Sequence, residues 1–155
     1  MEVKFSYNEA LLGLTLIVSA ADGVLRKPET DARVHMVLNE QITTAEIDAF
    51  KSKHNQLGST KELYSVSIKS ILNQDLDRKA KVLAYMYMVA NVASKEQEEE
   101  ATDLDHLEEM EDYINDDKYV DLEELIWINK AKKDLKVNLV TMKEEFSKIP
   151  ATKRI

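Results

Sequence analysis

Apolar residues recur at helical spacing along most of the chain, and no stretch shows the alternation of a half-buried strand. The pattern predicts an all-α fold, a compact bundle of seven or eight helices. Residues 1–150 are expected to form one domain, followed by a frayed basic tail at 151–155. The expected helices lie at about residues 6–21, 28–40, 43–54, 59–72, 78–93, from 103, 121–135 and 141–149.

Two of these segments are apolar on nearly every side, and they are the predicted core helices. They read "ALLGLTLIVSAA" at 10–21 and "VLAYMYMVANVA" at 82–93. A helix that is hydrophobic around most of its circumference is usually buried. The other helices show narrower apolar faces. Val34, Val37 and Leu38 are expected to form the inner face of the second helix.

Polar residues mark where several helices begin. A Ser, Thr or Asp followed three residues later by Glu is a capping box, in which side chains satisfy the first backbone amides. Asp75 or Asp77 is expected to cap the long helix after residue 77, and Pro28 suits a first helical turn. The four predicted capping boxes are Ser6/Glu9, Thr43/Glu46, Ser59/Glu62 and Asp121/Glu124.

An acidic motif occurs twice, each time after one of the two apolar segments. In "ADGVLRKPE" Asp22 precedes Glu29 by seven positions, and in "DDKYVDLEE" Asp117 precedes Glu124 by the same spacing. A hydrophobic pair lies between the two carboxylates in both copies, and a predicted helix follows both. This repetition indicates two pseudo-symmetric halves.

With these residues the sequence resembles the tellurite-resistance TerB family and the TerB-like domains of membrane-anchored J-domain proteins. The family's mark is an apolar helix ending in Ala-Asp-Gly, followed by a Glu early in the next helix. Here the first copy is Ala21, Asp22, Gly23 and Glu29. The resemblance covers about residues 8–138.

The second copy of the motif departs from the family pattern. Lys118 stands where Gly is usual, and residues 94–116 form an acidic insertion ahead of the motif. A second alignment places the counterpart of the first motif at Ser94, where the Asp is lost.

The resemblance implies a non-catalytic, all-helical stress-response domain. It also implies that a divalent cation binds between the two acidic loops, and that a protein partner is engaged near the inner membrane. The matching positions for a metal site are Asp22, Glu29, Asp117 and Glu124. Carboxylate oxygens suit hard cations such as Ca²⁺, and Zn²⁺ or Mn²⁺ are alternatives.

A purely local role explains the same four carboxylates. Asp before Gly often bonds the amides of its own turn, and Glu in a first turn favours the helix dipole. The sequence leaves both interpretations open. The histidines His35, His54 and His106 show no metal-binding spacing and are expected to be ordinary helix residues.

Charge and composition narrow the range of functions. The net charge is −8, and residues 95–124 hold 15 acids against two lysines. Such a block repels phosphate backbones, so nucleic acid is not an expected ligand. With no cysteine, no leader-like start and no apolar run long enough for a bilayer, we expect a cytoplasmic protein without direct membrane insertion.

No catalytic constellation is visible: a nucleophile elbow and a Gly-rich phosphate loop are both missing from the sequence. We therefore expect a protein that is not an enzyme. The alternative to metal binding is a metal-free interaction module, which uses the acidic insertion and exposed apolar residues to recruit a protein partner.

Overall fold

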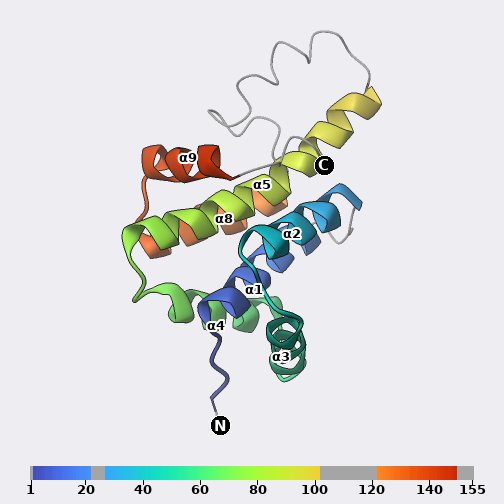
Figure 1. Cartoon of the computed structure of the whole chain (residues 1–155). Helices are drawn as coiled ribbons and strands as arrows, with labels where there is room; N and C mark the ends of the chain where they lie inside the picture. The colour runs from blue at the N-terminus through green and yellow to red at the C-terminus, as the bar shows by residue number, and fades with distance from the viewer. Residues whose placement is uncertain (1, 22–26, 102–121, 150–155) are drawn as a thin grey trace.

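The computed structural model describes residues 2–21, 27–101 and 122–149 of the chain (Figure 1). Within these ranges the protein forms seven helices and no strand, which confirms the all-α prediction. The helices, labelled as in Figure 1, are α1 (Tyr7–Ala20), α2 (Lys27–Asn39), α3 (Thr44–His54), α4 (Thr60–Ile71), α5 (Leu76–Ala101), α8 (Leu122–Leu135) and α9 (Leu139–Lys148).

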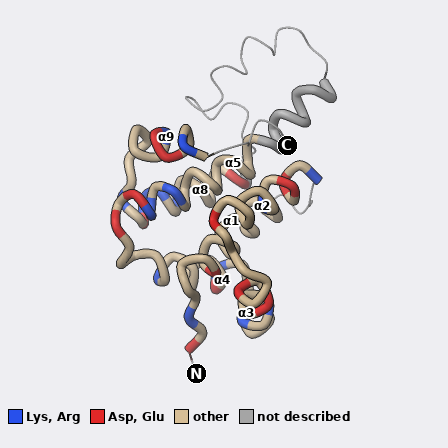
Figure 2. The backbone as a smooth tube through the Cα atoms, viewed as in Figure 1, with Lys and Arg blue, Asp and Glu red and all other residues tan. Residues whose placement is uncertain are grey.

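The core is built around α1 and α5, as the two apolar segments predict. α1 packs against α2, α3, α4, α5 and α8, and α5 packs against α1, α2, α8 and α9. Residues 82–91 of α5 are all buried, so this helix has no solvent-facing side over that length. Figure 2 shows that α1 and the middle of α5 carry almost no charged residues, whereas α3 and α9 carry both acidic and basic residues.

The observed caps explain where the helices begin. Ser6 and Thr43 each form a full capping box, with amide–oxygen distances of 2.7–3.2 Å. The Ser59 hydroxyl accepts a hydrogen bond from the Glu62 amide at 3.2 Å. At α5 the cap is Asp75, whose carboxylate accepts from the Arg78 amide at 2.9 Å.

The expected inner face of α2 is wrong for two of its three residues. Val34 is 50% exposed and Leu38 is 68% exposed, whereas Ala32 and Met36 are fully buried. Apolar residues are spread around most of α2, so periodicity alone does not choose which side faces the core. The contacts of α2 with α5 decide it, and they turn Ala32 and Met36 inward.

The core helix α5 is longer than the apolar pattern predicts. It continues to Ala101, so Ser94 lies within a helix and not in a loop. The alignment that places the second acidic loop at Ser94 is therefore wrong. Polar residues 95–101 extend a helix whose buried part ends earlier; the predicted helix from Asp103 and the rest of the acidic insertion lie outside the described residues.

Helices α1 and α4 approach each other closely at a glycine. A Cβ added to Gly13 would stand 2.6 Å from the Ser67 hydroxyl oxygen and 3.3 Å from a Leu63 methyl carbon. Only a residue without a side chain allows this approach.

No helix in the described ranges combines the length and the apolar character needed to cross a bilayer.

Candidate functional site

Two of the four predicted metal-site carboxylates lie on described helices. Glu29 is the third residue of α2 and Glu124 is the third residue of α8. Each has only 1% of its surface exposed. Asp22 and Asp117, the other two, lie outside the described residues. The structure therefore describes two of the four predicted ligands.

Burial separates these two glutamates from others in the same helical position. Glu46 and Glu62 are also third residues of their helices, but Glu62 is exposed and Glu46 is only half-buried. The pKa of Glu46 is lowered, mainly by the hydrogen bond that it accepts from the Thr43 amide and then by its bond from Asn8. A capping role alone does not require the burial seen at Glu29 and Glu124.

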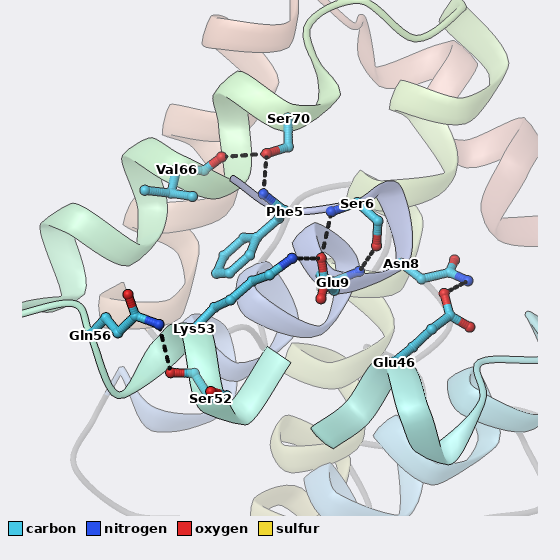
Figure 3. Close-up of polar contacts among 10 residues, drawn as sticks. All are labelled: Phe5, Ser6, Asn8, Glu9, Glu46, Ser52, Lys53, Gln56, Val66 and Ser70. Atoms are coloured by element: carbon cyan, nitrogen blue, oxygen red, sulfur yellow. Dashed lines mark hydrogen bonds and ion pairs between the residues drawn. The ribbon is translucent and has the colours of Figure 1, made fainter. Parts of the chain in front are cut away.

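Glu9 is the third residue of α1 and is also buried, at 3% exposure. Its carboxylate accepts from the Ser6 amide and pairs with Lys53 of α3 at 2.7 Å (Figure 3). This shows the usual requirement for an interior carboxylate, which is a compensating positive charge with good hydrogen-bond geometry.

Contacts of Arg33 place Glu29 along α1. The Arg33 guanidinium donates to the Thr15 hydroxyl at 3.2 Å and to the Leu12 carbonyl at 3.0 Å. Burial lowers its pKa to about 10, so it remains charged at neutral pH. Because α1 and α2 run antiparallel in Figure 1, Glu29, one turn before Arg33, lies further toward the C-terminal end of α1 than Arg33 does.

A second contact fixes the register of α1 and α5. The Tyr7 hydroxyl donates to the Arg78 carbonyl at 3.0 Å, so the two helices start close together, and both run toward the upper right of Figure 1. Ser19 lies 12 residues after Tyr7, and Asn91 lies 13 residues after Arg78. At about 1.5 Å per residue, these two buried polar residues stand at nearly the same height.

The position of Glu124 follows from Trp127, one turn later on α8. Trp127 lines a cavity together with Leu16, Ile17, Ala20 and Ala21 from the last turns of α1. Glu124 therefore also lies near the end of α1. From this helix geometry we infer that four buried polar residues lie toward one end of the bundle, which we call the polar end: Ser19, Glu29, Asn91 and Glu124.

The polar end has oxygen ligands of the right type for a hard cation. Two carboxylates can supply up to four oxygens, and Ca²⁺ takes six to eight from carboxylates, carbonyls, amides and water. In the described ranges, no three His, Cys, Asp or Glu residues gather as a metal-binding group. The carboxylate oxygens are thus of the type that a hard cation binds, but the described residues by themselves do not form a metal site.

Sequence reasoning missed Asn91. Its side chain is 2% exposed, and neither its amide oxygen nor its amide nitrogen has a hydrogen-bond partner within the described part of the chain. The signal was present, because an Asn in the middle of "MYMVANVA" breaks an otherwise apolar run. Buried amides are nearly always hydrogen-bonded, which makes this residue unusual.

A second charged region lies where α2, α5 and α9 meet. Glu40 accepts from the Tyr85 hydroxyl at 2.7 Å and pairs with Lys81 at 3.5 Å, and Glu145 pairs with Lys148 at 2.8 Å. Burial, the bond to Glu40 and its charge raise the pKa of Tyr85. Each carboxylate here has a cationic side chain beside it, so the arrangement stabilises the helix junction.

Comparison of the chain with protein-family models, with curated proteins and with solved structures finds no match. The TerB resemblance therefore stays a prediction from the sequence motif.

Proposed function

We propose that this chain is a non-catalytic, TerB-like stress-response domain that binds a divalent cation at the polar end of the bundle. The observation that carries the proposal is the matched burial of Glu29 and Glu124. Both are third residues of helices that follow the repeated acidic motif, and both are 1% exposed. Asp22 and Asp117 are the further ligands that the motif suggests.

The physical argument is one of charge. An ionised carboxylate in a protein interior is costly unless a positive charge accompanies it, and like charges that approach each other add to that cost. Lysine supplies the positive charge at Glu9 and at Glu145. A divalent cation bound by Glu29 and Glu124 would supply such a charge to two carboxylates at once, in addition to the contacts that each already makes.

The proposed role of the cation is structural. It would join the start of α2 to the start of α8, and hence the two halves of the repeat. A ligand that binds only the folded chain stabilises it by about 2.7 kcal/mol at a hundredfold excess over its dissociation constant. The cation would also hold in one arrangement the surface that a partner contacts.

Isothermal titration calorimetry with Ca²⁺, Mn²⁺ and Zn²⁺, on protein stripped with a chelator, tests the proposal. We expect one of these ions to release or absorb heat with a stoichiometry near one. Glu29→Gln and Glu124→Gln should each weaken binding by at least tenfold. Glu62→Gln is the matched control, because Glu62 holds the same helical position at the surface.

Two results would count against metal binding. One is the absence of heat and of any thermal shift with all three ions. The other is an equal loss of affinity in Glu62→Gln, which would mean that only overall charge matters.

The stress-response part of the proposal rests on the sequence motif. Its test is the growth of the source cells on tellurite after deletion of the gene, with complementation by wild type or by the Glu29→Gln/Glu124→Gln variant. Rescue by wild type alone supports a cation-dependent role. Normal tolerance in the deletion strain removes this part of the proposal.

The alternative of a metal-free interaction module is favoured by one observation on α2. Val34 and Leu38 lie one turn apart and are both at least half exposed, so they form a small apolar surface. If this surface recruits a partner, Val34→Ser/Leu38→Ser should abolish capture of that partner and leave metal binding unchanged. Capture that survives in the variant would reject a role for this surface.

A further inference from the structure

One buried amide has no hydrogen bond to the rest of the described chain. The Asn91 side chain on α5 is 2% exposed, and both its oxygen and its nitrogen lack partners within the described ranges. Among the residues that the structure describes, only Asn91 leaves two buried side-chain polar atoms unpaired. Because buried amides are nearly always hydrogen-bonded, this side chain suggests a ligand.

Asn91 lies where α5 is enclosed by other helices. Residues 82–91 are all buried, and α5 packs against α1, α2, α8 and α9. Two of these neighbours, α2 and α8, carry the buried glutamates Glu29 and Glu124 near their first turns. The unpaired amide is therefore on a core helix that contacts both glutamate-bearing helices.

The contacts of Glu40 give the height of Glu29 along α5. Glu40 directly follows α2, and it accepts from the Tyr85 hydroxyl at 2.7 Å and pairs with Lys81 at 3.5 Å. Figure 1 shows that α2 runs opposite to α5. Glu29 lies eleven residues before Glu40, which is about 16 Å along a helix axis. This distance brings Glu29 to within about one and a half turns of the height of Asn91.

Glu124 reaches a similar height from α8. Trp127, three residues after Glu124, lines a cavity together with Ile17 of α1. The register of α1 and α5 described above puts Ile17 about three residues short of the height of Asn91. Because α8 runs opposite to α5 in Figure 1, Glu124 lies beyond Ile17 and close to the height of Asn91.

The chemistry of an amide oxygen favours one class of cation. Ca²⁺ takes about six to eight oxygen ligands and combines carboxylates with neutral carbonyls, those of Asn included. Zn²⁺ is usually four-coordinate and is bound mainly by nitrogen and sulfur. A neutral oxygen beside two carboxylates adds a ligand without adding like-charge repulsion.

We propose that the Asn91 amide oxygen is a ligand of the cation bound by Glu29 and Glu124, and that this cation is Ca²⁺. The proposal rests on the function proposed above and adds the identity of the ion and a neutral ligand. The amide nitrogen would donate to one of the two carboxylates, so that binding would satisfy both ends of the amide.

Two substitutions at Asn91 should have opposite effects, which calorimetry measures. In chelator-treated protein Asn91→Leu should raise the Tm, because it removes the unpaired amide, and it should weaken Ca²⁺ binding at least tenfold. Asn91→Asp keeps an oxygen and adds a charge near two glutamates. We expect it to lower the Tm without ion and to bind Ca²⁺ at least as tightly as wild type. A purely structural role for Asn91 would not produce this pattern.

Ser67→Ala is the matched control. Ser67 is fully buried, and its hydroxyl also lacks a partner in the described part of the chain, but it faces Gly13, about two turns before the end of α1. The variant should bind Ca²⁺ as wild type. As a second measurement, paramagnetic Mn²⁺ should broaden the side-chain amide NMR signal of Asn91 and spare that of Asn138, which follows the other end of α8.

The outcomes separate this inference from the function on which it rests. If Ca²⁺ binds wild type and Glu29→Gln weakens it, but Asn91→Leu binds as tightly as wild type, the role of Asn91 is wrong and the cation site stands. Binding of Zn²⁺ without Ca²⁺ would likewise overturn only this inference. No binding of any ion to wild type would overturn both.

Discussion

Glu9 occupies the interior with two different kinds of partner. Its carboxylate accepts from the Ser6 amide at 2.7 Å, a contact that the sequence predicts from local spacing. It also accepts from Lys53 at 2.7 Å, a residue 44 positions away (Figure 3). The first contact follows from helix geometry alone, whereas the second depends on how α3 packs against α1.

Replacing Lys53 should be costly because it leaves the Glu9 carboxylate without its counter-ion. We expect Lys53→Met to lower the free energy of unfolding by about 2 kcal/mol, the scale of a hydrogen bond to a charged group. Urea denaturation measures this. Lys51→Met, at an exposed position on the same helix, should change stability by less than about 0.5 kcal/mol. Equal effects in the two variants would show that the ion pair contributes little.

Replacing Asn91 should stabilise the protein, whereas replacing Lys53 should destabilise it. Both polar atoms of its buried amide lack partners within the described ranges, and such a group costs about 1–3 kcal/mol. We therefore expect Asn91→Leu, which is close in volume, to raise the free energy of unfolding by about 1 kcal/mol. Thermal and urea unfolding measure this.

Asn138→Leu is the contrasting variant, because Asn138 caps α9 through a 2.8 Å bond from the Thr141 amide. Its loss should lower stability by about 1 kcal/mol. If Asn91→Leu destabilises the protein as much, then Asn91 makes a stabilising interaction that the described contacts do not include.

Among the helices, α1 and α4 depend on a single close approach. Gly13→Ala should lower the free energy of unfolding by about 1–3 kcal/mol, because the new methyl would stand 2.6 Å from the Ser67 hydroxyl oxygen. Ser67 Oγ has no hydrogen-bond partner in the described part of the chain, so Ser67→Ala alone should have little effect. In the double variant Ser67→Ala should recover much of the loss, and a double-mutant cycle in urea measures the coupling. Strictly additive effects would contradict this description of the crossing.

The start of α3 responds to pH in a defined direction. The pKa of Glu46 is lowered in the fold, first by the Thr43 amide and second by Asn8, which donates at 2.9 Å. A lowered folded-state pKa gives stability that is present above the ordinary value of 4.5 and is lost as the pH falls through the folded pKa.

Asn8→Ala removes one of these two bonds, so the pKa of Glu46 should rise toward its ordinary value. Carboxyl NMR titration measures this. Asn55→Ala, at the other end of α3, should leave it unchanged. A Glu46 pKa that is identical in wild type and Asn8→Ala would contradict the assignment.

The limits of sequence prediction are also clearest at the scale of the helices. Their starting points were predicted well, because Ser6, Thr43 and Ser59 act on amides only a few residues away. The inner face of α2 was predicted incorrectly, because Val34 and Leu38 are as apolar as Met36. The choice between them is made by α5. The length of α5 was also underestimated, since a helix can continue through polar residues after its buried part ends.

For the whole molecule, the sequence predicted that two repeated motifs would share one region. That sharing stays a prediction, and the structure adds that Glu29 and Glu124 are each buried, at 1% exposure. Their burial could not be derived from spacing, since Glu46 and Glu62 have the same helical position but are half-buried and exposed, respectively. Asp22 and Asp117 stay predicted ligands, because they lie outside the described residues.

The central claim is that one cation is shared by both halves of the repeat. Equilibrium dialysis against the tightest-binding ion, with elemental analysis of the protein, tests it in wild type, Glu29→Gln, Glu124→Gln and the double variant. A shared site predicts one ion per wild-type chain, a large loss in each single variant and little further loss in the double variant. Two ions per chain, independent losses at the two positions, or no bound ion in wild type would contradict the claim.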